Sequence, residues 1–318
     1  MGRKKEKEPI PMKAGRNKTI DLPLEEGQVY LSQCLTVTAP VTLSQAQNRL
    51  ILGDNLTVMP FLPEKSVDLL IADPPYNMNK AFHTESFKKQ SAQEYARYTR
   101  MWIEKALPLL KDNATVYVCC DWYSGMVIGS VLQEYFYVNN RVTWQREKGR
   151  GSQKGFKNGM EDIWCASVGR EPVFHPERVM LRKRVIAPYR ENGAPKDWEE
   201  TPDGRFRNTY PSNFWSDITV PYWSMAENTA HPTQKPEKLL AKLILASSEE
   251  NDVVFDPFAG SGSALVTAKK LGRRFIGVEK DAQYCVWAQL RLNRADNDKT
   301  IQGFSDGVFW ERNAKVTK

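Results

Sequence analysis

The sequence predicts an α/β protein with a mostly parallel sheet and helices on both faces of that sheet. Two apolar runs, at 67–72 and 253–255, each end in an Asp-Pro pair, and segments of strand and helix character alternate along the chain. Short apolar runs that stop at such a boundary are typical of buried strands. Alternation of strands with helices predicts a parallel sheet, because a parallel connection needs a long crossover.

The strand expected at 67–72 leads into the most informative motif of the chain. Five of its six residues are apolar, and it is followed directly by Asp73, Pro74, Pro75 and Tyr76. The prolines end regular pairing and remove two backbone donors. A carboxylate, a carbonyl and an aromatic ring are therefore expected at the carboxyl end of a strand, where open α/β sheets bind ligands. This set suits a flat ring that carries an amino group; an ordinary Asp-Pro turn is the alternative.

The second motif consists of a strand, a loop, a helix, a strand and an acid in that order. Asp256 ends a short strand, a loop with glycines at 260 and 262 follows, and residues 264–271 have helical character. Glycines let a ligand approach the backbone closely, and the N-terminus of a helix offers N–H groups to an anion. The next strand, at 274–280, contains Glu279 about twenty residues past the loop, where an acid commonly holds ribose hydroxyls. This order predicts a site for a nucleoside cofactor.

In combination, these residues resemble the amino-group DNA methyltransferases that use S-adenosylmethionine (SAM), of the restriction-modification type. The motif at 73–76 is similar to their catalytic motif, the loop from 256 to their cofactor loop, and His-Pro-Thr-Gln-Lys-Pro at 231–236 to the segment before that loop. The catalytic motif comes first and the cofactor loop last, with a long insert between them, which is the order of the β class. The resemblance covers residues 48–294 and implies a Rossmann-like SAM-dependent methyltransferase fold with an irregular insert for target recognition.

The resemblance also implies site residues. Catalysis is assigned to Asp73, Pro74, Pro75 and Tyr76, without a metal or a covalent intermediate. The residues implied for the cofactor are Asp54, Asn55, Leu56, Asp73, His231, Thr233, Lys235, Asp256, Phe258, Ala259, Gly260, Ser261, Gly262, Ser263 and Glu279. Asp54 is expected to accept the adenine amino group of SAM, although it also fits a helix-start turn, and both roles are compatible. Thr233 and Lys235 are expected near the SAM carboxylate, and Glu279 on the ribose.

The implied chemistry is methyl transfer to an exocyclic amino group of a DNA base. The lone pair of such a group is delocalised into the ring. Hydrogen bonds to Asp73 and to the Pro74 carbonyl would free it and stabilise positive charge in the transition state. The base must leave the duplex, and Tyr76 is the expected stacking platform. Asp at the first motif position is the usual adenine-N6 form, whereas Ser is usual for cytosine-N4, the alternative substrate. The intact motifs argue against a catalytically silent DNA-binding subunit.

Further elements follow from local patterns. Strands are expected at 49–52, 115–119, 138–144 and 161–165, with helices at 92–110 and 124–135. The predicted organisation is a disordered basic arm at 1–19, a catalytic half at 20–145, a target-recognition region at 146–225, a cofactor half at 226–296 and a tail at 297–318. Within the tail, residues 308–310 are expected to pack back on the body.

Positive charge predicts a polyanionic partner. The net charge is +7, and residues 141–190 alone hold twelve Lys and Arg against five Asp and Glu. The residues expected to contact double-stranded DNA are Arg146, Lys148, Arg150, Lys154, Lys157, Arg182, Lys183 and Arg184. A solvated loop is the alternative. Aromatic residues between 198 and 223 are expected to form a small core of the insert rather than base-stacking platforms.

Cysteine spacing and hydropathy indicate the cellular environment of the protein. Five cysteines show no Cys-x-x-Cys pair, so neither a zinc site nor a disulfide framework is indicated. The adjacent Cys119 and Cys120 lie in an apolar run and are expected to be buried structural thiols. No apolar stretch reaches eighteen residues, which argues against membrane spans. The cysteines favour a reducing interior, and the resemblance implies a cytoplasmic protein of bacterial, archaeal or phage origin. A homodimer and a restriction endonuclease for the same site are left open as partners.

Overall fold

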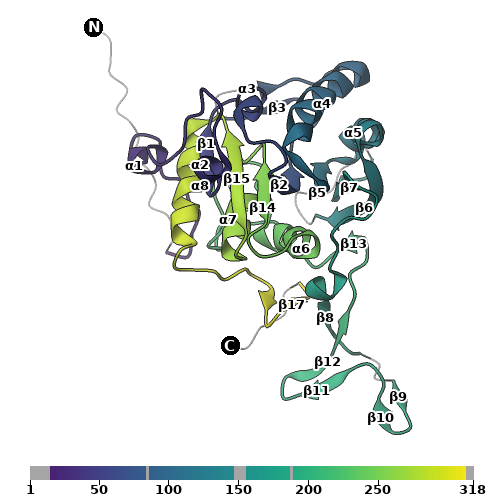
Figure 1. Ribbon diagram of the computed structural model, residues 1–318. Coiled ribbons are helices and arrows are strands. Elements are labelled where there is room, and N and C mark those ends of the chain that lie inside the picture. Colours follow the sequence, from purple (N-terminus) through teal and green to yellow (C-terminus); the bar gives the residue numbers. More distant parts are fainter. Residues whose placement is uncertain (1–14, 84–85, 147–154, 187–188, 313–318) are drawn as a thin grey trace.

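The computed structural model describes residues 15–83, 86–146, 155–186 and 189–312. Their centre is an eight-stranded sheet between layers of helices (Figure 1). The strands lie in the order β1 (Arg49–Leu52), β15 (Arg274–Glu279), β14 (Val253–Asp256), β2 (Val67–Ala72), β5 (Leu110–Cys120), β7 (Met160–Ser167), β6 (Tyr137–Gln145) and β13 (Phe214–Trp215). The first five strands in this order, β1, β15, β14, β2 and β5, are parallel to one another. Strand β7 runs antiparallel to both of its neighbours, β5 and β6. The predicted α/β fold with a mostly parallel sheet is confirmed.

Helices cover both faces of this sheet. On one face lie α4 (Ala92–Ala106) and α5 (Trp122–Tyr135), and on the other α6 (Glu237–Ser247), α7 (Ser263–Lys270) and α8 (Ala282–Arg294). Strand β2 contributes Leu70 and Ala72 to the first core. Its Leu69 and Ile71 belong to the second core. A strand that is buried on both faces needs apolar side chains at nearly every position, which explains the continuous apolar run.

Helix α4 begins and ends where its sequence dictates. Ser91 and Glu94 form a capping box at its N-terminus, in which Ser91 Oγ accepts a hydrogen bond from the Glu94 N–H. The helix ends at Ala106, earlier than the expected residue 110, because Pro108 cannot continue it. Strand β5 accordingly begins at Leu110 instead of residue 115.

The two strands that carry the predicted motifs are neighbours in the sheet. Leu70 of β2 pairs with Phe255 of β14, so Asp73 and Asp256 lie at the same edge. From β2 the chain continues through α4 to β5, and from β14 it continues through α7 to β15, in opposite directions along the sheet. Such a reversal leaves a crevice at the carboxyl ends of the strands, where open α/β sheets bind ligands.

A smaller sheet projects from the main body (Figure 1). Its strands lie in the order β11 (Glu199–Thr201), β12 (Gly204–Thr209), β8 (Leu181–Arg184), β17 (Val308–Trp310) and β16 (Phe304–Ser305), and a separate hairpin pairs β9 (Arg190–Glu191) with β10 (Ala194–Pro195). The expectation of an irregular insert is therefore wrong here. The strands β8 and β12 are short and rich in Arg and Lys, so they lack the apolar alternation that would reveal them. Phe309 is fully buried beside Ala241 of α6, which confirms that residues 308–310 pack back on the body.

The aromatic residues between 198 and 223 differ in burial. Trp198 is buried within the insert and Phe206 is half-buried, whereas Trp215 of β13 is buried in the core of the main sheet rather than in a core of the insert. Four others are exposed, contrary to the expectation of a core: Tyr210, Phe214, Tyr222 and Trp223. The core prediction therefore holds for only part of the set.

Two predictions about apolar segments are also tested by the fold. Cys119 and Cys120 are buried in β5, which confirms them as structural thiols. Within the described ranges, no helix combines the length and the apolar character needed to cross a membrane.

Candidate active site

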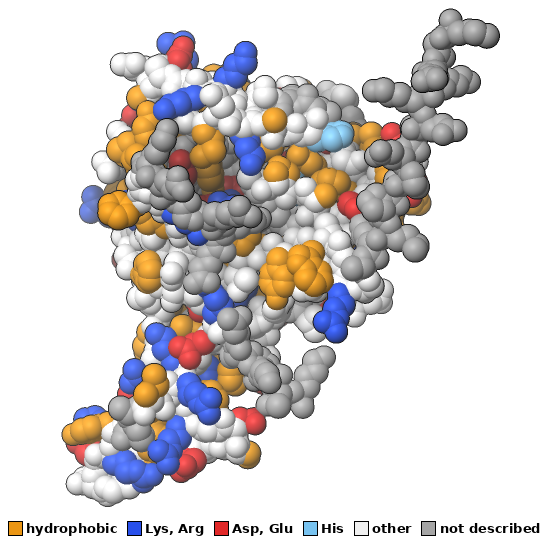
Figure 2. Space-filling model, turned by 180° about the vertical axis from the view of Figure 1, so that it is seen from behind, with side chains coloured by type: hydrophobic (Ala, Val, Ile, Leu, Met, Phe, Trp, Pro, Cys, Tyr) orange, Lys and Arg blue, Asp and Glu red, His pale blue; other side chains and the backbone are white. Residues whose placement is uncertain are grey.

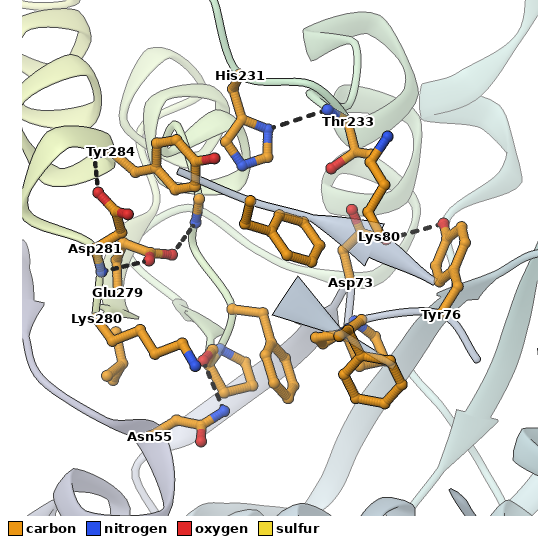
Figure 3. Close-up of a pocket in the computed structure, with 18 of the residues that line it drawn as sticks. Asn55, Asp73, Tyr76, Lys80, His231, Thr233, Glu279, Lys280, Asp281 and Tyr284 are labelled. Atoms are coloured by element: carbon orange, nitrogen blue, oxygen red, sulfur yellow. Dashed lines mark hydrogen bonds between the residues drawn. The ribbon is translucent and has the colours of Figure 1, made fainter. Parts of the chain in front are cut away.

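A pocket of about 350 Å³ opens at the carboxyl edge of the sheet, at the ends of β1, β2, β14 and β15 (Figure 3). All four residues of the predicted catalytic motif line it: Asp73, Pro74, Pro75 and Tyr76. Figure 3 shows Asp73 and Tyr76 on one side of the pocket and Glu279 on the other. The structure thus brings the two sequence motifs to one cavity.

Asp73 accepts hydrogen bonds on both of its carboxylate oxygens. Tyr76 Oη donates to Oδ1 at 3.0 Å, and Lys235 Nζ donates to Oδ2 at 2.6 Å. Lys235 also donates to Tyr76 Oη at 3.0 Å and lies 3.3 Å from Glu161 Oε2. The structure therefore places the Lys235 ammonium on the catalytic motif, although the resemblance implied a place near the cofactor carboxylate.

Burial governs the acidities in this cluster. Burial raises the pKa of Asp73, while the neighbouring Lys235 ammonium acts in the opposite direction. Burial also raises the pKa of Tyr76 well above its ordinary value, so the phenol keeps its proton. For Lys235, burial lowers the pKa, but the carboxylates of Asp73 and Glu161 outweigh burial and raise the pKa above its usual range. The lysine is therefore held in its charged form.

The loop after β14 has a conformation that its glycines require. Gly260 has a φ of 52° and Gly262 a φ of 76°, both in the left-handed region. A Cβ atom on Gly262 would lie 2.7 Å from Ala288 Cβ of α8, so this glycine allows the loop to pack on the helix. A Cβ atom on Gly260 would lie 3.0 Å from His231 Nε2. The Gly260 N–H donates to Glu279 Oε2 at 2.7 Å, which joins the loop to the acid at the end of β15.

Most residues that the resemblance implies for the cofactor meet at this edge. Those that line the pocket are Asp54, Asn55, Leu56, Asp73, His231, Thr233, Phe258, Gly260 and Glu279. Others line an adjoining hollow of about 30 Å³: Lys235, Asp256, Ala259, Ser261 and Ser263. Gly262 lines neither of these two cavities.

Two of these residues have clear structural partners. Asp54 Oδ1 accepts from two backbone N–H groups at the start of α3 (Asn55–Val58), at 3.0 and 3.3 Å, which confirms the predicted helix-start turn. The His231 ring packs edge-on against Tyr284, with 4.4 Å between ring centroids. Burial, together with the charge of Lys235, lowers the pKa of His231 to about 3, so its imidazole is neutral. Its Nδ1 can therefore accept from the Thr233 N–H at 3.3 Å.

The residues expected to contact DNA lie in different places. Lys148, Arg150 and Lys154 fall outside the described residues. Arg146 lines the pocket, and its Nη1 donates to Glu161 Oε1. Lys157 is exposed, and Arg182, Lys183 and Arg184 belong to β8 of the smaller sheet. Figure 2 shows Lys and Arg side chains interspersed with Asp and Glu on this projecting part.

Arg182 has partners within the smaller sheet. It forms an ion pair with Glu199, and its side chain is 13 % exposed. Its guanidinium carbon lies 5.0 Å from the ring centroid of Phe206 and 5.5 Å from that of Trp310. Arg182 thus stabilises the packing of β8 between β12 and β17.

Sequence reasoning missed Glu161 as a site residue. This glutamate lies near the start of β7, whose antiparallel direction brings that start to the edge where β5 ends. Its side chain is 6 % exposed and contacts Tyr76, Lys235 and Arg146. The available signal was a pair of acids, Glu161-Asp162, in an otherwise apolar strand, because buried carboxylates need partners.

Solved structures of DNA methyltransferases share this fold. The M1.HpyAVI complex with SAM has a TM-score of 0.53 and 23 % identity, covering 77 % of this chain and 98 % of that one. PvuII DNA methyltransferase, described as cytosine-N4-specific, has a TM-score of 0.56 and 16 % identity, covering 82 % and 93 %. TTHA0409 of Thermus thermophilus, a putative DNA modification methylase complexed with SAM, has a TM-score of 0.53 and 20 % identity, covering 84 % and 99 %. These likenesses confirm the Rossmann-like methyltransferase fold.

Sequence comparison establishes the family. A family model described as a DNA methylase, of the N6/N4 methyltransferases, matches residues 67–290. The type II methyltransferase M.HpaI of Haemophilus parainfluenzae is 31 % identical over 251 residues, which are 78 % of this chain and 75 % of that protein. The type II methyltransferase M2.LlaDCHI of Lactococcus lactis subsp. cremoris is 31 % identical over 260 residues, which are 77 % of this chain and 89 % of that protein. The chain therefore belongs to the N6/N4 family of DNA methylases.

Proposed function

We propose that this chain is a site-specific methyltransferase that transfers a methyl group from SAM to the N6 amino group of an adenine flipped out of duplex DNA. The observation that carries the proposal is that the motif at 73–76 lines the same pocket as Gly260 of the loop and Glu279 of β15. Membership in the DNA methylase family supports the reaction class. Bringing an amino group and a methyl donor together in one cavity makes their reaction effectively unimolecular.

The residues of the pocket fit SAM. The Asp54 carboxylate would accept from the adenine amino group, and the charged amino-acid end would lie toward Thr233 and the loop at 256–263. Glu279 would accept from the ribose hydroxyls. Its two oxygens already accept backbone N–H groups at 2.7 and 2.8 Å, which fixes the carboxylate and leaves lone pairs for the ribose. When bound, SAM supplies a methyl group that its positive sulfonium activates.

The motif at 73–76 would activate the target amino group. The two N–H groups would donate to an Asp73 oxygen and to the Pro74 carbonyl, which frees the nitrogen lone pair and stabilises the positive charge that develops there. One amino proton would then pass to the Asp73 carboxylate, whose raised pKa suits a proton acceptor, and from there to water. Tyr76 offers a ring face to the flipped base.

The choice of adenine rests on Asp73. Asp at the first position of this motif is the usual form of the adenine-N6 enzymes that the sequence resembles. The fold alone does not separate the two bases, since the PvuII enzyme with a similar fold is described as cytosine-N4-specific. Methylation of cytosine N4 would use the same acceptors and the same pocket.

The setting that we infer is a bacterial restriction-modification system. Both curated relatives have type II names, which supports a partner endonuclease that acts on the same DNA site. Double-stranded DNA would contact the basic residues of the insert, and a protein that acts on bacterial DNA would work in the cytoplasm. Light scattering with and without DNA would test whether the working form is a homodimer.

Transfer of labelled methyl groups tests the proposed function. Unmethylated plasmid DNA incubated with the protein and tritium-labelled SAM should become labelled, and RNA or added proteins should not. Sequencing of the modified positions would then define the recognised site. Label confined to RNA or protein would contradict the proposal.

A further inference from the structure

Asp73, Tyr76, Glu161 and Lys235 form a compact cluster beside the pocket. The Lys235 ammonium lies 2.6 Å from Asp73 Oδ2 and 3.3 Å from Glu161 Oε2. Tyr76 Oη lies 3.0 Å from Asp73 Oδ1 and 3.2 Å from Glu161 Oε2. The side chains of Lys235 and Glu161 are 8 % and 6 % exposed, so water screens these charges little. The carboxylates of Asp73 and Glu161 therefore compete for hydrogen bonds from one ammonium and one hydroxyl group.

This arrangement conflicts with the role that the proposed function gives to Asp73. Both Asp73 oxygens already accept hydrogen bonds within the cluster, at 3.0 and 2.6 Å. An ammonium at this distance also opposes the positive charge that develops on the target nitrogen. Lys235 cannot simply lose its partner, because leaving a buried charge unpaired is strongly unfavourable.

The position of Glu161 resolves the conflict. Its Oε2 atom is near both donors, so a small movement redirects the hydrogen bonds of the Lys235 ammonium and of the Tyr76 hydroxyl to it, while its Oε1 atom stays paired with Arg146. We propose that Glu161 is a positioning residue that takes over the Lys235 ammonium and the Tyr76 hydroxyl. The Asp73 carboxylate is thereby freed to accept the amino group of the target base. This inference rests on the proposed function and deepens it at the same site.

A cluster that only stabilises the fold would have the same geometry at rest. The two roles differ once the charge of Glu161 is removed and its shape is kept. In Glu161→Gln the neutral amide binds an ammonium less well, so Lys235 remains on Asp73. A structural role changes the free energy of unfolding alone, whereas the positioning role changes how the protein recognises the amino group of the base.

The decisive readout is DNA binding rather than turnover. Duplexes carry either adenine or purine, which lacks the 6-amino group, at the mapped target position opposite an abasic site, so that flipping breaks no base pair. With S-adenosylhomocysteine present, the wild type should bind the adenine duplex about tenfold more tightly, the scale of a hydrogen bond to a charged group. Glu161→Gln should abolish this preference and leave the affinity for SAM unchanged in calorimetry. For a cytosine target, the matched pair is cytosine and 2-pyrimidinone.

Asp162→Asn is the matched control. Asp162 is the next residue of β7 and is also 6 % exposed, but its Oδ1 accepts from Thr143 Oγ1 at 2.6 Å, outside the cluster. This variant should keep the wild-type preference for adenine. Glu161→Asp keeps the charge on a shorter side chain and should show an intermediate preference for adenine. If Glu161→Gln does not fold, Glu161→Asp serves as the test variant.

A double substitution tests whether Glu161 acts through the ammonium. Glu161→Gln combined with Lys235→Gln removes the cation that the single variant leaves on Asp73, so part of the preference for adenine should return. A double variant that prefers adenine no more than Glu161→Gln would overturn the inference, as would a wild-type preference in Glu161→Gln itself. Failure of the proposed function is distinguishable, because the wild type would then transfer no methyl group to DNA.

Discussion

Replacing Asp73 should separate catalysis from folding and from SAM binding. In Asp73→Ala, Lys235 Nζ retains Glu161 Oε2 at 3.3 Å and Tyr76 Oη at 3.0 Å. Removing one member of a buried ion pair ordinarily lowers the free energy of unfolding by about 3–5 kcal/mol. This loss should not arise here, because the ammonium keeps other partners. We expect the free energy of unfolding, measured by chemical denaturation, to fall by only about 1–2 kcal/mol, the scale of one or two lost hydrogen bonds.

Methyl transfer should fall much further than stability. Loss of one electrostatic partner of the transition state lowers rates by about two to three orders of magnitude, which corresponds to about 3–4 kcal/mol of activation free energy. The assay is the single-turnover rate of a preformed complex with DNA, with SAM affinity measured in parallel by calorimetry and expected to change by no more than a few-fold. Asp73→Asn should lose as much as Asp73→Ala, because the amide keeps the shape but not the charge.

Asp68→Asn is a matched control from β2, the strand that leads into Asp73. Asp68 has its own lysine partner, since Lys111 Nζ donates to its Oδ1 at 2.6 Å. This variant should transfer methyl groups at close to the wild-type rate. Near-wild-type transfer in Asp73→Ala would remove Asp73 from the mechanism, and equal losses in both variants would assign the effect to the fold.

Three other predictions concern the loop, a buried acid and the flipped base. Gly260→Val places a branched side chain at φ 52° and against His231, so SAM binding should be lost; unchanged affinity in calorimetry would refute the assigned loop. Burial raises the pKa of Asp256 to about 8, so the folded state holds a proton that the unfolded chain has released, and stability should fall as pH rises from about 4 to about 8. Asp256→Asn should flatten this fall in thermal melts, and an unchanged slope would contradict the assignment. If Asp73 and Tyr76 frame a flipped base, 2-aminopurine at the target position should brighten on binding; constant fluorescence would count against flipping.

The parallel half of the sheet could be predicted because its signals are local. β2 and β14 are built on short apolar runs, each of which leads into an Asp-Pro pair, and such runs are visible without knowing which strands pair. The smaller sheet could not be predicted in the same way. Its strand β17 comes from near the end of the described chain and pairs with β8 of the insert, so neither segment reveals its partner. Pairing between such distant segments leaves no periodicity in either one.

In the candidate site, too, local signals could be predicted and contacts between distant segments could not. The motif at 73–76 and the loop at 256–263 are contiguous in sequence, so their residue types and order already indicate their roles. Glu161 reaches the site only because β7 runs antiparallel to β5. Lys235 reaches Asp73 from the segment before α6, a contact that its neighbours in the sequence do not indicate. Tertiary contacts between distant polar side chains decide these two placements.

Identification of the methylated nucleoside tests the central claim most directly. Duplex DNA without prior methylation is incubated with the protein and SAM that carries a deuterated methyl group, then digested to nucleosides and analysed by mass spectrometry. The account predicts deuterated N6-methyladenine, formed about two to three orders of magnitude more slowly by protein with Asp73→Ala. Deuterated N4-methylcytosine would contradict the assignment to adenine while leaving the fold and the site in place. No deuterated nucleoside at all, with DNA that contains the recognised site, would contradict the proposal that this chain is a DNA methyltransferase.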